Sequence, residues 1–323
     1  MEKLKFSEMD MDINQPTPVK PTGLFSGTVL FHEMRTLAAK NNTLLIILAA
    51  IGLASLTLLF AYQDYLQTIR QTPAVPVETV LMNGRLIYGA IFIVQMIVAV
   101  CVTPWVTAGA LTSERENKTL NLLKTTPLSA LSILGGKALA GVCYSVLVIL
   151  TTLPVQVVSL MLAEVSVAEI LIDYAIVLMT VLCTASLGLF ISAFNINRRK
   201  SMGLTYLITL VQNLLVPLMI LIIGYQILSG SQNMAELAKR WMLPEMGLVY
   251  CIYFLMVINP LGVAFGSEWF YLSGHSWFSY QVTLSNGDPL TFLSPWIPFL
   301  IGGLLFFICL ILAGIFHFNR EES

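Results

Sequence analysis

The sequence predicts an all-α polytopic membrane protein with six transmembrane helices, an N-terminal interfacial amphipathic helix, and a re-entrant or interfacial segment before the last span. Composition is the first reason, since charged residues are 11% of the 323-residue chain, against about 25% in soluble domains. The second reason is a set of apolar segments without Asp, Glu, Lys or Arg that reach the length of about 20 residues needed to cross a bilayer. These spans are expected near 43–62, 86–111, 138–163, 174–194, 202–228 and 296–316.

The N-terminal part of the chain is expected to precede the membrane. Residues 1–23 are rich in proline and carry charges of both signs, which predicts a flexible cytoplasmic lead. Across residues 24–42, apolar side chains such as Met34 and Leu37 fall on one helical face, and polar ones such as Arg35 fall on the other. This pattern predicts an amphipathic helix lying on membrane lipid, with an ordinary cytosolic helix packed against the spans as the alternative.

The transmembrane domain is expected to occupy residues 43–323. Its first apolar run begins near residue 43 and is longer than the apolar core of a secretory signal peptide, so it should remain as the first span. The segment Met246–Ile258 is apolar but too short to cross a bilayer, and we interpret it as re-entrant or interfacial. Residues 229–295 would then form one long external connection.

Lysine and arginine positions predict the orientation, because cytoplasmic segments carry an excess of these residues. With the N-terminus inside, 13 of the 17 lysines and arginines fall in cytoplasmic segments and 4 fall in outer ones. The expected protein is therefore multi-pass in the cell (inner) membrane, with both termini in the cytoplasm.

Residues 112–137 form a charged segment between the second and third predicted spans and are expected to make a cytoplasmic hairpin. Ser113 followed by Glu116 matches a capping box, which predicts that a helix begins there. Thr126 followed by Pro127 predicts the start of a second helix. A capped surface loop without a partner is one interpretation, while leucines beside the charges favour a protein contact.

This segment also contains a run of residues shared with a known family. The residues are Leu111-Thr112-Ser113-Glu114-Arg115-Glu116, Lys118-Thr119-Leu120, Leu122-Leu123, Thr126-Pro127-Leu128-Ser129 and Gly136-Lys137. Together they resemble the signature of the ABC-2 type permeases, the membrane subunits of ATP-binding-cassette exporters. The six-span plan, the lead helix with Glu33 and Arg35, and the pair Asn259-Pro260 extend the resemblance over most of the chain. The pair Asn117-Lys118 departs from the family pattern, which commonly has a glycine before the Thr-Leu pair.

The resemblance implies that the hairpin couples this chain to ATP hydrolysis. It implies a separate cytoplasmic ATPase subunit, which would bind ATP and Mg²⁺ and hold the hairpin in a cleft, and a second permease subunit in a homodimer or heterodimer. The residues that it assigns to ATPase coupling are Glu114, Arg115, Glu116, Thr119, Leu120, Leu122, Leu123, Pro127 and Leu128. Lys137 is expected either to anchor the third span at the lipid headgroups or to snorkel there without another role.

The sequence lacks the residues that characterise several other functional classes. No Walker A motif is present, since Gly135-Gly136-Lys137-Ala138 has neither the spacing nor the hydroxyl residue after the lysine, so this chain is expected to bind no cofactor itself. The sequence suggests no catalytic constellation, no metal site and no nucleic-acid partner, and its five cysteines all lie in apolar runs. Carboxylates, which ion-coupled carriers use as relays, are absent from the predicted spans.

Few polar residues lie within the predicted spans. Gln95, Gln212 and Asn213, together with a helix-kinking Pro217, are candidates to face a translocation path, although such amides more often hydrogen-bond a neighbouring helix. The rest of the path would be apolar, which suits a lipid-like, peptide or amphiphilic drug substrate. The sequence therefore favours the permease subunit of an ATP-driven exporter. A non-transporting scaffold that tethers a cytoplasmic ATPase is the alternative, and an ion-coupled secondary transporter is a third.

Overall fold

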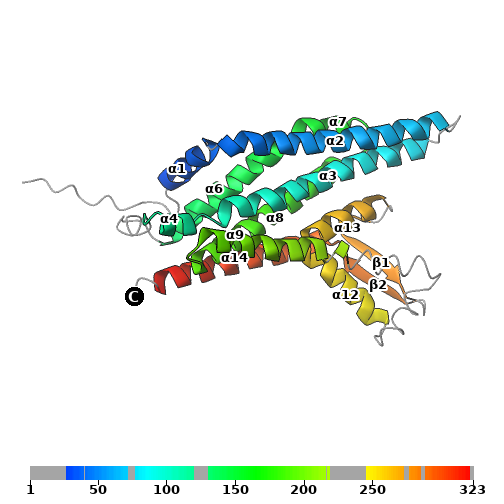
Figure 1. Cartoon of the computed structure of the whole chain (residues 1–323). Coiled ribbons are helices and arrows are strands. Elements are labelled where there is room, and N and C mark those ends of the chain that lie inside the picture. The colour runs from blue at the N-terminus through cyan, green and yellow to red at the C-terminus, as the bar shows by residue number, and fades with distance from the viewer. Residues whose placement is uncertain are drawn as a thin grey trace, which may run out of the picture.

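The computed structural model describes residues 27–39, 41–71, 77–119, 130–215, 217–218, 245–272, 276–284 and 288–320. Helices make up most of this part of the chain, as Figure 1 shows. The long helices are α2 (Asn41–Gln71), α3 (Val77–Thr107), α6 (Ala130–Leu150), α8 (Val167–Phe194) and α14 (Trp296–Arg320). The shorter elements are α1 (Gly27–Ala38), α4 (Thr112–Glu116), α7 (Leu153–Leu160), α9 (Arg198–Leu210), the π-helix η1 (Val211–Leu215), α12 (Glu245–Ile258), α13 (Pro260–Leu272), β1 (Ser279–Thr283) and β2 (Pro289–Leu293).

Helices α3 and α8 form the centre of the bundle. They pack against each other, α2 lies along α3, and α14 lies along α8 (Figure 1). Phe92 and Met96 of α3, and Ile176 and Val181 of α8, are almost fully buried in this core. Outward-facing positions are apolar as well, for example Leu305 of α14, which is 59% exposed. Helices that are apolar on all sides are typical of a bilayer rather than of water.

The described residues contain five helices that are long and apolar enough to cross a membrane, or six if the bent pair α12 and α13 counts as one span. The predicted class, a multi-pass helical membrane protein, is confirmed. Helix α8 begins at Val167 rather than near residue 174, so this candidate span includes Glu169 and Asp173. The prediction that the spans lack carboxylates is therefore wrong for α8, where both side chains bind polar partners inside the protein.

The third predicted span, 138–163, consists of two helices rather than one. Helix α6 ends at Leu150, and α7 follows after a turn with Pro154 at its start. Proline has no N–H to continue the preceding helix and is favoured in a first turn, so the helix restarts there. The Ile149 carbonyl accepts from the backbone N–H of Thr152 at 3.0 Å and from its hydroxyl at 2.7 Å, so the end of α6 is hydrogen-bonded within the turn.

Three other predicted segments are described only in part or not at all. The fifth predicted span, 202–228, is described over α9 and η1. The predicted lead, 1–23, lies outside the described residues. The predicted helix 24–42 corresponds to α1, which packs on α6 with Leu37 buried and Phe31 exposed.

The connection 229–295 contains both helices and strands. Helices α12 and α13 meet at Asn259 with a bend of 112°. Strands β1 and β2 pair antiparallel, with Tyr280 opposite Phe292. These two side chains are buried together with Val249 of α12, which holds the strands against the helix. The sequence interpretation did not include this two-stranded sheet, which is a small addition to the predicted helical fold.

Candidate coupling site

A buried ion-pair cluster joins α1, α4 and α6 at one end of the bundle (Figure 1). Lys137 of α6 is 4% exposed, and its ammonium group pairs with the carboxylate of Glu33 on α1. The same group lies 3.4 Å from Glu114 Oε1 on α4. A buried ammonium is stable only when carboxylates replace its hydration. The expectation that Lys137 lies at the headgroups is therefore wrong, and this residue instead holds α1 and α4 together.

Thr119 closes the turn that follows α4. Its backbone N–H donates to the Glu114 carbonyl at 3.0 Å, and its hydroxyl donates to the Glu114 carboxylate. Lys118 has a φ of 59°, the left-handed conformation that glycine adopts at lower cost than other residues. Lys118 therefore has, at this turn, the backbone conformation that a glycine would adopt more easily.

The N-terminus of α4 is capped by α8 rather than by its own side chains. The Ser192 hydroxyl oxygen accepts hydrogen bonds from the backbone N–H of Leu111 at 3.0 Å and of Thr112 at 3.1 Å. Leu111 is the N-cap residue, and no side-chain cap hydrogen bond is made there. The predicted capping box of Ser113 and Glu116 is therefore wrong, because a neighbouring helix supplies the acceptor that these N–H groups need.

Arg115 and Glu116 contact the connection between α8 and α9. Arg115 Nη1 donates to the Asn195 carbonyl at 3.0 Å. Glu116 Oε1 accepts from the backbone N–H of Arg198, the first residue of α9, at 2.8 Å. A carboxylate at that position complements the positive end of the helix dipole. Both side chains thus bind this chain itself, while Glu116 also remains exposed, and its predicted contact with an ATPase stays a prediction.

Close packing fixes the junction of α3 and α4 to the rest of the bundle. Gly188 of α8 approaches Thr107 of α3 so closely that a Cβ atom on Gly188 would lie 2.3 Å from Thr107 Oγ1. Ser201 of α9 donates its hydroxyl to the Ala108 carbonyl at 2.6 Å. Because packed interiors do not deform continuously, a displacement of α4 must also move its neighbours.

The remaining predicted coupling residues, Leu120, Leu122, Leu123, Pro127 and Leu128, lie outside the described residues. On α1, Glu33 belongs to the ion-pair cluster, whereas Arg35 is exposed.

The predicted path residues contact different helices. Gln95 of α3 is buried and donates to the Thr152 hydroxyl at 3.0 Å. Gln212 of η1 donates to a carbonyl at the end of α12, also at 3.0 Å. Both glutamines thus make the helix–helix hydrogen bonds that were the alternative interpretation. Asn213 is 5% exposed, Pro217 is half-buried, and a path along these residues stays a prediction.

A second polar cluster, which the sequence interpretation missed, joins α3 and α8 near their contacts with α13. Arg85 of α3 forms an ion pair with Glu169 of α8, in which Arg85 Nη2 donates to both carboxylate oxygens, at 3.0 and 3.1 Å. The Tyr88 hydroxyl donates to Asp173 Oδ2 at 2.8 Å. Two signals could have identified these residues. Ser166 followed by Glu169 matches a helix N-cap, which the structure contains, and the two acidic residues lie one turn apart on one helix face.

Comparison with known proteins agrees with this architecture. The family model described as ABC-2 family transporter protein matches residues 27–323. Curated proteins gave no significant match. The matched range begins at the first residue of α1 and includes α14, so it contains both polar clusters. The chain therefore belongs to the ABC-2 family of transporter proteins.

Proposed function

We propose that this chain is the permease subunit of an ATP-driven exporter. It forms half of a translocation path for a lipid-like, peptide or amphiphilic drug substrate, and a second permease subunit, identical or related, supplies the other half. Residues 112–137 couple it to a separate ABC ATPase subunit that binds ATP and Mg²⁺. The chain lies in the cell (inner) membrane with both termini in the cytoplasm.

The observation that carries the proposal is the ion-pair cluster of Lys137, Glu33 and Glu114. A subunit that hydrolyses ATP outside the membrane needs a rigid element through which its motion reaches the spans. The cluster connects α4 to α1 and α6. The Thr112 N–H donates to the Ser192 hydroxyl oxygen of α8, and the Arg198 N–H of α9 donates to Glu116, so α4 is also connected to α8 and α9. Coupling between distant sites travels through contiguous contacts of this kind. This network supports a coupling role for the loop that begins with α4.

We expect the chain, reconstituted in lipid vesicles with its ATPase, to move an amphiphilic substrate when ATP is supplied on the ATPase side. Uptake of a fluorescent lipid, peptide or drug into inverted vesicles measures this activity. The control is an ATPase subunit whose phosphate-loop lysine is replaced, which should assemble but not drive uptake. A stable complex that transports none of these classes, and whose ATP hydrolysis none of them stimulates, would favour the scaffold.

The predicted orientation places position 276 outside the cell and position 117 inside it. Single cysteines replacing Ser276 and Asn117 in a cysteine-free background are treated, on intact cells, with an impermeant maleimide. Both side chains are exposed in the structure, so labelling reports the membrane side rather than burial. We expect position 276 to react and position 117 to react only after the membrane is opened. Labelling of position 117 on intact cells would overturn the orientation.

A further inference from the structure

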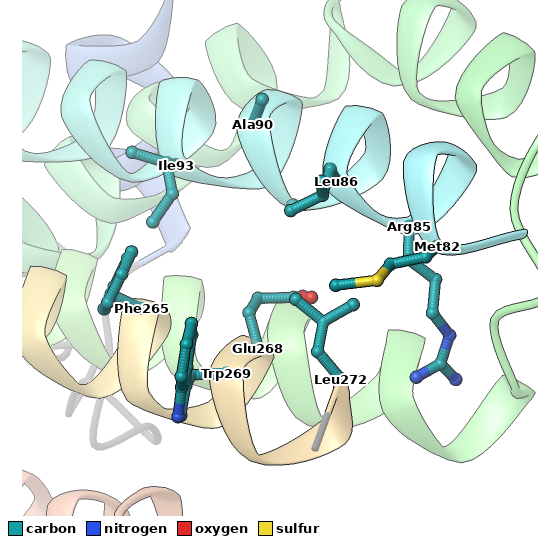
Figure 2. A pocket seen from close by; sticks show the side chains of 10 residues that line it. Met82, Arg85, Leu86, Ala90, Ile93, Phe265, Glu268, Trp269 and Leu272 are labelled. Atoms are coloured by element: carbon teal, nitrogen blue, oxygen red, sulfur yellow. The ribbon is translucent and has the colours of Figure 1, made fainter. Parts of the chain in front are cut away.

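A cavity of about 360 Å³ lies between α3 and α13, beside the second polar cluster. Figure 2 shows Leu86, Ala90 and Ile93 on the α3 side and Phe265, Trp269 and Leu272 on the α13 side. The volume is within the range of about 300–1,000 Å³ that small-ligand sites commonly have. The cavity therefore offers a mostly apolar space of the right size for a small organic molecule.

Glu268 is the acidic residue that lines this cavity. Its side chain extends from α13 into the space between the two helices (Figure 2). The carboxylate lies beside Gly89 of α3, where a Cβ atom would be at an ordinary contact distance of 3.4 Å from Glu268 Oε2. Glu268 Oε1 is buried and receives no hydrogen bond from an N–H or hydroxyl group of the described residues. Among the described residues, no basic side chain forms an ion pair with this carboxyl group.

Arg85 does not form such an ion pair with Glu268. Arg85 also lines the cavity, as Figure 2 shows, but its guanidinium group makes its ion pair with Glu169 of α8. It also donates to the backbone carbonyls of Tyr271 and Glu164, each at 3.1 Å. The charges of Arg85 and Glu169 offset each other, so this pair leaves the charge of Glu268 uncompensated.

Asp173 adds a second carboxyl group beside Glu268. It is 1% exposed, and its Oδ1 receives no hydrogen bond from an N–H or O–H group of the other described side chains. The carboxyl groups of Asp173 and Glu268 lie within hydrogen-bonding reach of each other. Such a bond requires one proton on the pair, because two carboxylates at this distance repel. A pair that holds one proton carries one negative charge beside the cavity.

We propose that this cavity binds a lipophilic organic cation with a single positive charge. The apolar walls contact the hydrocarbon part of the ligand, and Glu268 provides the opposite charge. The ring of Trp269 adds a cation–π interaction. A metal ion fits less well, because Glu169 is already bound by Arg85 and the opposite wall offers hydrocarbon instead of oxygen ligands. The inference depends on the proposed function in one respect only, since it assigns a positive charge to the amphiphilic substrate proposed above. Binding itself requires neither ATPase nor transport.

Two ions of matched size and shape but opposite charge test the proposal, tetraphenylphosphonium and tetraphenylborate. The purified chain, in nanodiscs of phosphatidylcholine and without an ATPase, is dialysed against each radiolabelled ion. Empty nanodiscs give the lipid background. We expect saturable binding of the phosphonium ion, and borate binding weaker by about tenfold or more, since the borate ion meets a like charge. Equal affinity for the two ions would overturn the proposal.

Variants assign the binding to this cavity. Glu268→Gln keeps the shape and removes the charge, so phosphonium binding should weaken by about tenfold or more. Ala90→Phe reduces the volume and should weaken binding while all charges remain. Asp64→Asn, at an exposed position of α2 outside the cavity lining, is the matched control and should leave binding unchanged. Thermal unfolding of each variant confirms that it is folded.

The outcomes separate this inference from the proposed function. Phosphonium binding that Glu268→Gln leaves unchanged contradicts the inference even if the complex transports other amphiphiles. Binding that follows the predicted pattern supports the inference even if the complex moves no substrate, a result that would count against the exporter alone.

Discussion

Replacing Arg85 with alanine is expected to lower the free energy of unfolding by about 3–5 kcal/mol, the range for removing one partner of a buried ion pair. The Arg85 side chain is 24% exposed, but that of Glu169 is only 7% exposed, so the carboxylate left behind could not recover its hydration. Asp173 lies on the same face of α8 and would add repulsion. Unfolding of the purified protein in detergent, by heat or denaturant, measures the loss.

Two matched variants show whether the orphaned charge causes that loss. Arg85→Ala combined with Glu169→Gln removes both charges and should regain most of the stability. Arg70→Ala removes an exposed arginine from α2 and should change the free energy of unfolding by less than about 0.5 kcal/mol. If Arg85→Ala costs no more than Arg70→Ala, the ion pair does not stabilise the fold.

The apolar runs predicted the membrane helices because the bilayer dictates both their length and their composition. Helices α2 and α14 contain the predicted spans 43–62 and 296–316 within their bounds. The predicted span began too late for α8, because the run of uncharged residues that predicts it starts only after Asp173. The structure extends the helix further, since Arg85 and Tyr88 bind the carboxylates of Glu169 and Asp173. These partners are more than 80 residues away in sequence, and no local pattern connects them.

The β1–β2 pair shows a signal that was present but not used. The dipeptide Asn286-Gly287 stands between two segments of alternating polarity, which is a strong sequence sign of a hairpin. By contrast, the ion-pair cluster at α4 leaves no such sign. Glu33 and Lys137 are 104 residues apart in sequence. A lysine just before an apolar run is the pattern expected of a residue at the lipid headgroups, and only the fold shows that Lys137 is paired with carboxylates.

Replacing Lys137 with methionine is expected to reduce ATP-driven transport by about tenfold or more, a usual size for coupling between two sites. Methionine fills the space of the lysine stem but leaves Glu33 and Glu114 without a counter-charge. Their side chains are 24% and 27% exposed, so water can hydrate both carboxylates once α1 and α4 separate. The stability loss should therefore be about 1–3 kcal/mol, less than for Arg85→Ala. Vesicle transport and thermal unfolding give the two measurements.

Two further variants distinguish coupling from simple destabilisation. Lys137→Arg keeps the charge and should retain most of both stability and transport. The triple variant Lys137→Met, Glu33→Gln, Glu114→Gln leaves no unpaired charge and should recover stability. If the ion pairs carry the motion of the ATPase to α1 and α6, this triple variant stays folded, still binds the ATPase, and transports poorly. Full transport by the triple variant would mean that the cluster only holds the fold. The coupling would then have to pass through the contacts of α4 with α8 and α9.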